Sequence, residues 1–223
     1  MIPFADVVKQ VQQGSGRSVI LAPHPDDEVI GCHRVIRAGL IDAVVYFFER
    51  EGQRVKESQV AASQLGFCPF QWPAMPDDIN CLFIPMAEEK HQHHLYVYHT
   101  AKAIPARQRI YYSVAMNVPH EVLDLDERAG KRNMLDRFYP SQQKLWENDE
   151  RYYLFEAYSL SPFAPHPIMG EVRTLLTAAE VLRNLTPVDN LSESDRQRYR
   201  EAAAEVALFK HKVNWNALVK ELP

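Results

Sequence analysis

The sequence predicts an α/β protein with a mostly parallel sheet flanked by helices. Over the first 115 residues, short apolar segments alternate with amphipathic ones. One of the apolar segments, 43–48, reads Ala-Val-Val-Tyr-Phe-Phe without interruption, which is typical of a strand covered on both faces. A strand, a helix and a second strand in succession favour the right-handed crossover that joins parallel strands.

The predicted elements follow one another through short connections. A first strand spans 18–22, and the helix after it, 27–38, has acidic residues in its first turn and Gly39 beyond its end. A second helix over 54–65 ends at Gly66. The remaining elements of this alternating part are strands at 67–72 and 81–84, a helix at 94–104 and a strand at 109–115.

Beyond residue 117 the pattern becomes helical. The predicted helices span 131–137, 141–147, 170–184 and 194–219. In the last of them, apolar side chains recur every three or four residues, so this helix would pack on the sheet or on a second copy of the chain. We therefore expect one α/β domain over 1–160 and a helical C-terminal extension over 161–223 packed on it, whose helices are the candidate contact for a homo-oligomer.

The composition is that of an ordinary globular protein. Of 223 residues, 46% are hydrophobic and 24% charged. A net charge of -4 leaves no basic excess to neutralise a nucleic-acid backbone, so a nucleic-acid partner is not expected. We see no signal peptide and no apolar stretch of about 18 residues, and the three cysteines form no CxxC pair. These features predict a cytoplasmic protein with no membrane contact.

The most informative segment is 22–28, Ala-Pro-His-Pro-Asp-Asp-Glu, which follows the first predicted strand. Open α/β sheets build their sites at the carboxyl ends of strands. A His and an Asp together suit zinc or a similar divalent ion, and the neighbouring Asp is then free to act as a base on water. A turn followed by an acidic helix start would also explain the carboxylates, but it would not explain His24.

A second cluster, His91-Gln92-His93-His94, stands at another strand–helix junction. Surface histidine clusters are common, and each segment alone is a weak signal. A metal site, however, needs ligands from separate elements that converge on one point. Two clusters at strand ends of one parallel sheet meet that condition, so the sequence favours a metal site between them.

The chain resembles the zinc-dependent N-deacetylases of the PIG-L/LmbE-like type over about residues 17–160. The opening HPDDE…G motif is the most specific part of the resemblance. The similar segments are APHPDDEVIGC at 22–32, Arg54-x-x-Glu57 with Ala61-Ala62 and Leu65-Gly66, HQHH at 91–94, YYSV at 111–114, and Lys131, Tyr139, Ser141-Gln142 and Glu156.

The resemblance implies a Rossmann-like domain and one zinc ion per chain, or another divalent transition metal, held by His24, Asp27 and His94. It also implies that Asp26 is the general base on the attacking water. His91 would assist the oxyanion or protonate the departing amine. The implied activity is hydrolysis of a linear amide C–N bond, which removes an N-acetyl or N-acyl group from an amino sugar or related small molecule.

Two further residues are candidate substrate contacts by the same resemblance. Arg54 would bind sugar hydroxyls or a phosphate, and Asp77 or Asp78, of which we take Asp78 as the candidate, would bind the sugar. Each also has a plain alternative, a surface charge at a helix start for Arg54 and a turn residue for Asp78. Two alternative functions stay open: an amidohydrolase acting on a non-sugar amide, and a non-catalytic family member that binds a sugar-like or nucleotide-like ligand.

The chain departs from the family pattern in three places. His33 and Arg34 stand where small residues are usual, and they would face solvent or crowd the pocket. His93 replaces an Asp, so His93 rather than His94 could be the metal ligand. Only about a dozen residues separate Asp78 from His91, where the family usually has a longer insertion, and substrate choice depends on that wall of the pocket.

Overall fold

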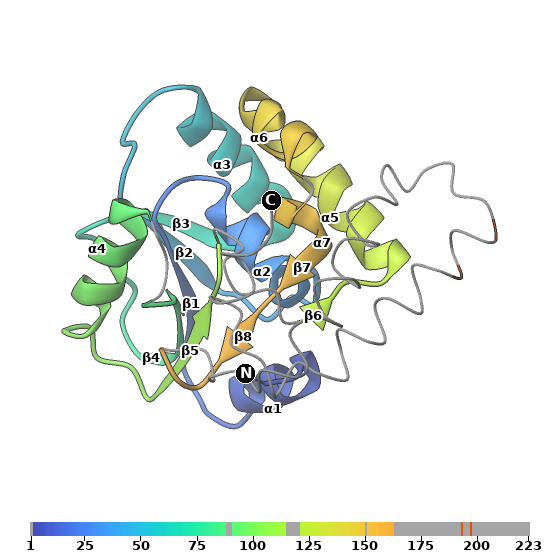
Figure 1. Cartoon of the computed structure of the whole chain (residues 1–223). Coiled ribbons are helices and arrows are strands. Elements are labelled where there is room, and N and C mark those ends of the chain that lie inside the picture. Colours follow the sequence, from blue (N-terminus) through green and yellow to red (C-terminus); the bar gives the residue numbers. More distant parts are fainter. Residues whose placement is uncertain are drawn as a thin grey trace.

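The computed structural model describes residues 2–87, 91–114, 121–149, 151–162, 193 and 197. Its centre is a six-stranded sheet in the order β3-β2-β1-β4-β5-β8 (Figure 1). The strands are β1 (Arg17–Ala22), β2 (Ala43–Tyr46), β3 (Cys68–Gln71), β4 (Ile79–Pro85), β5 (Gln108–Tyr112) and β8 (Tyr158–Ser159). The first five are parallel and β8 is antiparallel to β5, so the predicted Rossmann-like, mostly parallel sheet is confirmed.

Helices cover both faces of this sheet. They are α1 (Phe4–Gln12), α2 (Asp27–Arg37), α3 (Gln53–Leu65), α4 (Gln92–Ala101), α5 (Leu125–Phe138), α6 (Gln143–Asn148) and α7 (Arg151–Leu154), with a 3-10 turn at Pro140–Gln142. Two short strands, β6 (Glu121–Val122) and β7 (Phe155–Glu156), pair with each other. The alternating part matches the predicted order of elements closely, whereas α1 and the short strands β6, β7 and β8 were not predicted.

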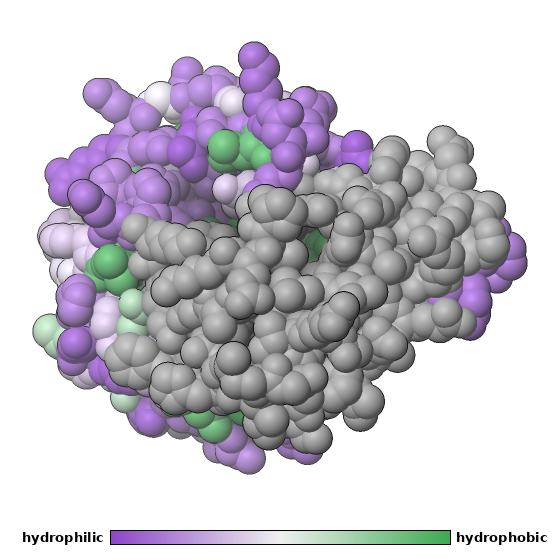
Figure 2. All heavy atoms as spheres, in the orientation of Figure 1, coloured by the Kyte–Doolittle hydropathy of each residue, from purple (hydrophilic) through white to green (hydrophobic). Residues whose placement is uncertain are grey.

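Alternate residues along each strand pack on opposite faces of the sheet. In β1, Ile20 belongs to the core shared with α1, α2, α3 and α5, and Val19 belongs to the core under α4. Because both faces are covered, all residues of β2 and β4 are buried, as the continuous apolar segment at 43–48 predicted for β2. Figure 2 shows mainly hydrophilic residues over α3 and α6, whose outer sides meet solvent.

Local signals in the sequence fix where the helices begin and end. Gly66 takes a left-handed conformation (φ 82°) and its N–H donates to the carbonyl of Ala62, which ends α3 where predicted. α5 begins with a capping box in which Asp124 accepts a hydrogen bond from the Glu127 amide at 2.8 Å. The helix predicted at 131–137 therefore begins earlier, at Leu125.

Three polar pairs hold the segment after residue 124 together and fix it to the sheet-flanking helices. These pairs are Tyr139 with Glu28, Ser141 Oγ with Glu57 Oε2 at 2.6 Å, and Lys131 Nζ with Glu156 Oε1 at 3.7 Å. All six residues belong to the motifs on which the family resemblance depends. Since a buried polar group that loses its partner is costly, the first two pairs hold the end of α5 and the turn after it against α2 and α3, and the third joins α5 to β7.

The predicted helices at 170–184 and 194–219, and with them most of the predicted extension over 161–223, lie outside the described residues. Among the residues that are described, no helix is long and apolar enough to cross a membrane.

Candidate metal centre

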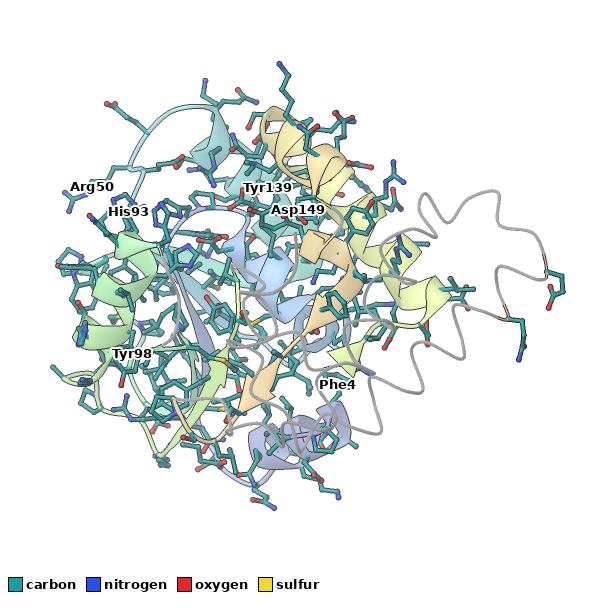
Figure 3. All side chains as sticks on the ribbon, in the orientation of Figure 1. Phe4, Arg50, His93, Tyr98, Tyr139 and Asp149 are labelled. Carbon is teal, nitrogen blue, oxygen red and sulfur yellow. The ribbon has the colours of Figure 1, made fainter. Side chains whose placement is uncertain are left out.

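The two histidine-bearing segments meet at one edge of the sheet. β1 and β4 are adjacent and parallel, so the loops that follow them begin side by side. The β1 loop carries His24, Asp26 and Asp27, and the segment after β4 leads into α4 with its histidines. Figure 3 shows His93 at the start of α4, on the side of the β1 loop. The two histidine-bearing segments therefore lie close together, as predicted from their positions after parallel strands.

His24, Asp27 and His94 form a group that could hold a metal ion, here named the inner triad. Asp27 Oδ2 lies 3.0 Å from His24 Nδ1 and 3.5 Å from His94 Nε2. Bonds to zinc of about 2.0–2.1 Å imply about 3.3–3.5 Å between ligand atoms in a tetrahedral site. The observed separations fit such a set with small adjustment, and the residues therefore suit a divalent ion.

The electrostatics of Asp27 favour this role. Burial alone would raise the pKa of the Asp27 carboxyl, but the imidazoles of His94 and His24 outweigh burial and hold that pKa well below its usual range. A carboxylate must be ionised to bind a metal. Asp27 also accepts a hydrogen bond from the His24 amide at 2.8 Å, which fixes the carboxylate beside the imidazole.

Asp26, the adjacent carboxylate, has different partners. It is 1% exposed, its backbone is left-handed (φ 116°), and its Oδ1 accepts a hydrogen bond from Arg54 Nη2 at 2.7 Å. Within the described part of the chain, its Oδ2 has no hydrogen-bond partner. Burial and the neighbouring charge of Asp27 raise the pKa of Asp26, and Arg54 opposes them. One carboxylate oxygen is thus held in place while the other is unpaired.

Arg54 is engaged by the protein itself. Besides Asp26, it donates from Nε to the Pro25 carbonyl at 3.1 Å and from Nη1 to Glu49 Oε1 at 2.5 Å. Its side chain is 19% exposed. Arg54 therefore orients the loop that carries Asp26, and the expected contact with substrate stays a prediction.

Asp78 is not brought to this edge. It stands directly before β4, its carbonyl accepts a hydrogen bond from the Arg17 amide at the start of β1, and its carboxylate pairs with Arg107 at 2.5 Å. These contacts belong to the amino ends of the parallel strands, opposite the inner triad. We therefore leave Asp78 out of the proposed site.

His91 lies at the rim of the site. Its Nδ1 accepts a hydrogen bond from the His93 amide at 3.3 Å, which caps α4, and its ring centre lies 5.0 Å from that of His94. Burial, followed by the neighbouring imidazoles, lowers the pKa of His91. The sequence left His93 and His94 open as the ligand. In the structure His94 joins Asp27, while His93 is exposed and its Nδ1 lies 2.7 Å from His24 Nε2.

Sequence reasoning missed the aromatic side of the site. Phe48 stacks on His93 with ring centres 3.9 Å apart, and Tyr96 lies edge-on to Phe48 at 5.6 Å. Phe48 lies just beyond the end of β2, which neighbours β1 in the sheet. This position after a strand could have placed Phe48 at the same edge of the sheet as His24. Glu49, which accepts a hydrogen bond from Arg54, directly follows Phe48 and was also missed, although its position carried the same signal.

The expectation that His33 would face solvent or crowd the pocket is wrong in both forms. His33 is 0% exposed, its Nδ1 lies 4.0 Å from Glu156 Oε1, and neither ring nitrogen has a hydrogen-bond partner among the described residues. Burial lowers its pKa to about 3. α5 covers this side of α2, which a one-dimensional pattern does not reveal. Arg34 is partly exposed and pairs with Glu127 at 2.9 Å.

Comparison of the chain with protein-family models, with curated proteins and with solved structures finds no match in any of the three.

Proposed function

We propose that the chain is a metal-dependent hydrolase that removes an N-acetyl or other N-acyl group from an amino sugar or related small molecule. One observation carries the proposal: next to Asp27 of the inner triad stands Asp26, whose buried Oδ2 has no hydrogen-bond partner among the residues that the structure describes. The motif resemblance over residues 17–160 supports the same reaction and suggests the class of substrate.

The inner triad would hold one zinc ion or a similar divalent ion. Two imidazoles and one carboxylate leave room for a further ligand, which is the usual composition of catalytic zinc sites. When bound, the ion supplies positive charge that polarises an amide carbonyl and favours the ionisation of water.

Asp26 is the proposed general base. Its Oδ1 is anchored by Arg54 at 2.7 Å, so the carboxylate cannot rotate freely, and Oδ2 is left to accept a proton from water. A base that is fixed in orientation loses little entropy when the reaction begins. Arg54 therefore acts on the reaction through the position of Asp26.

His91 is proposed to donate a hydrogen bond to the carbonyl oxygen of the substrate amide or a proton to the departing amine. It is exposed at the start of α4 and lies 5.3 Å, ring centre to ring centre, from His24. An imidazole at the rim can reach a bound amide and stabilise the negative charge that develops on its carbonyl oxygen.

The same chemistry on a non-sugar amide is the second candidate. The specific observation is the aromatic wall of Phe48, His93 and Tyr96 beside the inner triad. Such a wall stacks on a sugar ring and on an aromatic acyl or amine group alike. The substrate panel must therefore contain both classes.

The test combines metal content with turnover on that panel. Zinc-loaded protein is incubated with N-acetylated sugars, nucleotide sugars and acylated amines, and release of the free amine is measured. We expect Asp26→Asn to retain the metal and to lose at least a hundredfold in turnover, because general-base contributions are of that size. Asp78→Asn, the matched control at the opposite edge, is expected to keep both properties.

Two results would overturn the proposal. Full turnover in Asp26→Asn would exclude Asp26 as the base. Metal-loaded protein that releases no amine from any member of the panel would instead favour a module that binds ligands without hydrolysing them.

A further inference from the structure

Four imidazoles gather at the mouth of the candidate site, although the inner triad uses only two of them. The ring centres of His91 and His93 lie 4.9 Å apart, and those of His24 and His93 lie 5.0 Å apart. His91 and His93 are both exposed. The inner triad therefore leaves two accessible imidazoles next to one of its own ligands.

The two nitrogens of His24 face different neighbours. Nδ1 lies 3.0 Å from Asp27 Oδ2, on the side of the inner triad, and Nε2 lies 2.7 Å from His93 Nδ1, on the outer side. A histidine in this position offers one donor atom to each side.

We propose that His24, His91 and His93 form a second metal-binding position, the outer triad, which shares His24 with the inner triad. One ligand atom from each of the three residues lies within 4.8 Å of the other two. A donor set made only of imidazoles suits zinc, copper or nickel ions, whereas magnesium and calcium prefer oxygen ligands.

The outer triad needs little movement to close around an ion. Two nitrogens bound to one tetrahedral zinc stand about 3.3 Å apart, so the 2.7 Å between His24 and His93 must widen by roughly half an ångström. His93 is exposed and can move this far without disturbing the core. Its stack on Phe48, with planes 14° apart, already limits the directions in which the ring can turn.

The second ion binds more weakly than the first. An imidazole with an ion on each nitrogen must release its ring proton to solvent, and the two positive ions repel each other. The outer triad also contains no carboxylate to offset the charge of its ion, whereas the inner triad has Asp27. Zinc should therefore bind in two distinguishable steps.

A consequence for activity rests on the proposed function. An ion in the outer triad occupies His91, the proposed donor to the substrate, and stands at the mouth through which the substrate enters. Zinc beyond the first equivalent is therefore expected to inhibit the hydrolase, and the outer triad would act as an inhibitory site.

The direct test is a calorimetric titration of the metal-free full chain with Zn²⁺, supported by metal analysis after gel filtration. We expect two binding steps in the wild type and loss of the weaker step in His93→Phe. That substitution keeps a ring to stack on Phe48 but removes the donor nitrogens. His99→Phe, on an exposed histidine of the same helix, is the matched control and should keep both steps. His91→Asn is expected to lose the same weaker step.

The outcomes separate this inference from the proposed function. A single step in the wild type, abolished by His94→Ala and unaffected by His93→Phe, would overturn the outer triad and leave the hydrolase proposal standing. Two steps, of which His93→Phe removes the weaker, would support the outer triad even if no amide on the panel is hydrolysed. Inhibition by excess zinc that persists in His93→Phe would refute the inhibitory role.

Discussion

Replacement of Arg54 by Met tests how the candidate base is held. Arg54 Nη2 lies 2.7 Å from Asp26 Oδ1, and Asp26 is only 1% exposed. Met keeps most of the apolar stem of Arg but removes the charge, so the Asp26 carboxylate would remain buried without its partner. Breaking a buried ion pair costs about 3–5 kcal/mol. Because the Arg54 side chain is 19% exposed and Asp26 can take up a proton, we expect a loss of about 2–4 kcal/mol in the free energy of unfolding.

The assay is urea unfolding followed by circular dichroism, in chelator so that metal binding does not contribute. Arg107→Met is the matched control. Arg107 pairs with Asp78 at 2.5 Å, but these side chains are 51% and 61% exposed, so the expected loss is at most about 1 kcal/mol. Adding Asp26→Asn to Arg54→Met should restore at least about 1 kcal/mol, because an amide tolerates burial without a cation better than a carboxylate does.

The reasoning would be refuted if Arg54→Met were no more destabilising than Arg107→Met. It would also fail if the effects of Asp26→Asn and Arg54→Met on the free energy of unfolding were simply additive in the double variant. A stable Arg54→Met variant whose only defect is a higher KM would instead assign Arg54 to substrate binding, as the family resemblance implies.

Two further predictions concern α2 and its neighbours. Gly31→Ala should destabilise the protein by about 1–3 kcal/mol, because its Cβ would stand 2.3 Å from the buried Tyr112 ring. Gly130→Ala should be neutral or stabilising, because its Cβ would stand 3.1 Å from the flexible end of the Arg37 side chain and in ordinary contact with His33 Nε2 at 3.8 Å. Equal effects of the two substitutions in thermal unfolding would contradict this. Acidification should also destabilise the protein through His33. Its pKa is about 3 when folded and about 6.5 when unfolded, so between these values only the unfolded state binds the proton, and stability is lost as the pH falls below 6.5. We expect His33 to contribute about 2 kcal/mol of loss between pH 7 and pH 5, and urea unfolding at the two pH values should show a smaller loss in His33→Gln.

The parallel sheet was predictable because its signals are local. The uninterrupted apolar segment at 43–48 contains β2, and Gly66 ends α3 because few residues other than Gly adopt its left-handed conformation. β8 has two residues and owes its place to pairing with β5 and not to any pattern of its own. Short elements of this kind are set by tertiary contacts, so a sequence pattern does not reveal them.

The members of the candidate site were predictable where their position relative to a strand decides at which edge of the sheet they lie. His24 and Asp27 follow β1, and His94 lies in the first turn of the helix that follows the neighbouring strand β4, so a parallel sheet brings them to one edge. The same rule, applied to Asp78, would have excluded it, because a residue directly before a parallel strand lies at the opposite edge. The buried state of His33 depends on α5, about a hundred residues away in sequence, and no local pattern carries that information.

The most direct test of the metal centre is the tight zinc-binding step in the wild type and in His94→Ala. His94 is nearly fully buried and its Nε2 lies 3.5 Å from Asp27 Oδ2, so its loss removes one of three converging ligands. We predict one tightly bound ion in the wild type and at least a hundredfold weaker binding in a folded His94→Ala variant. Unchanged zinc affinity in that variant would contradict the inner triad.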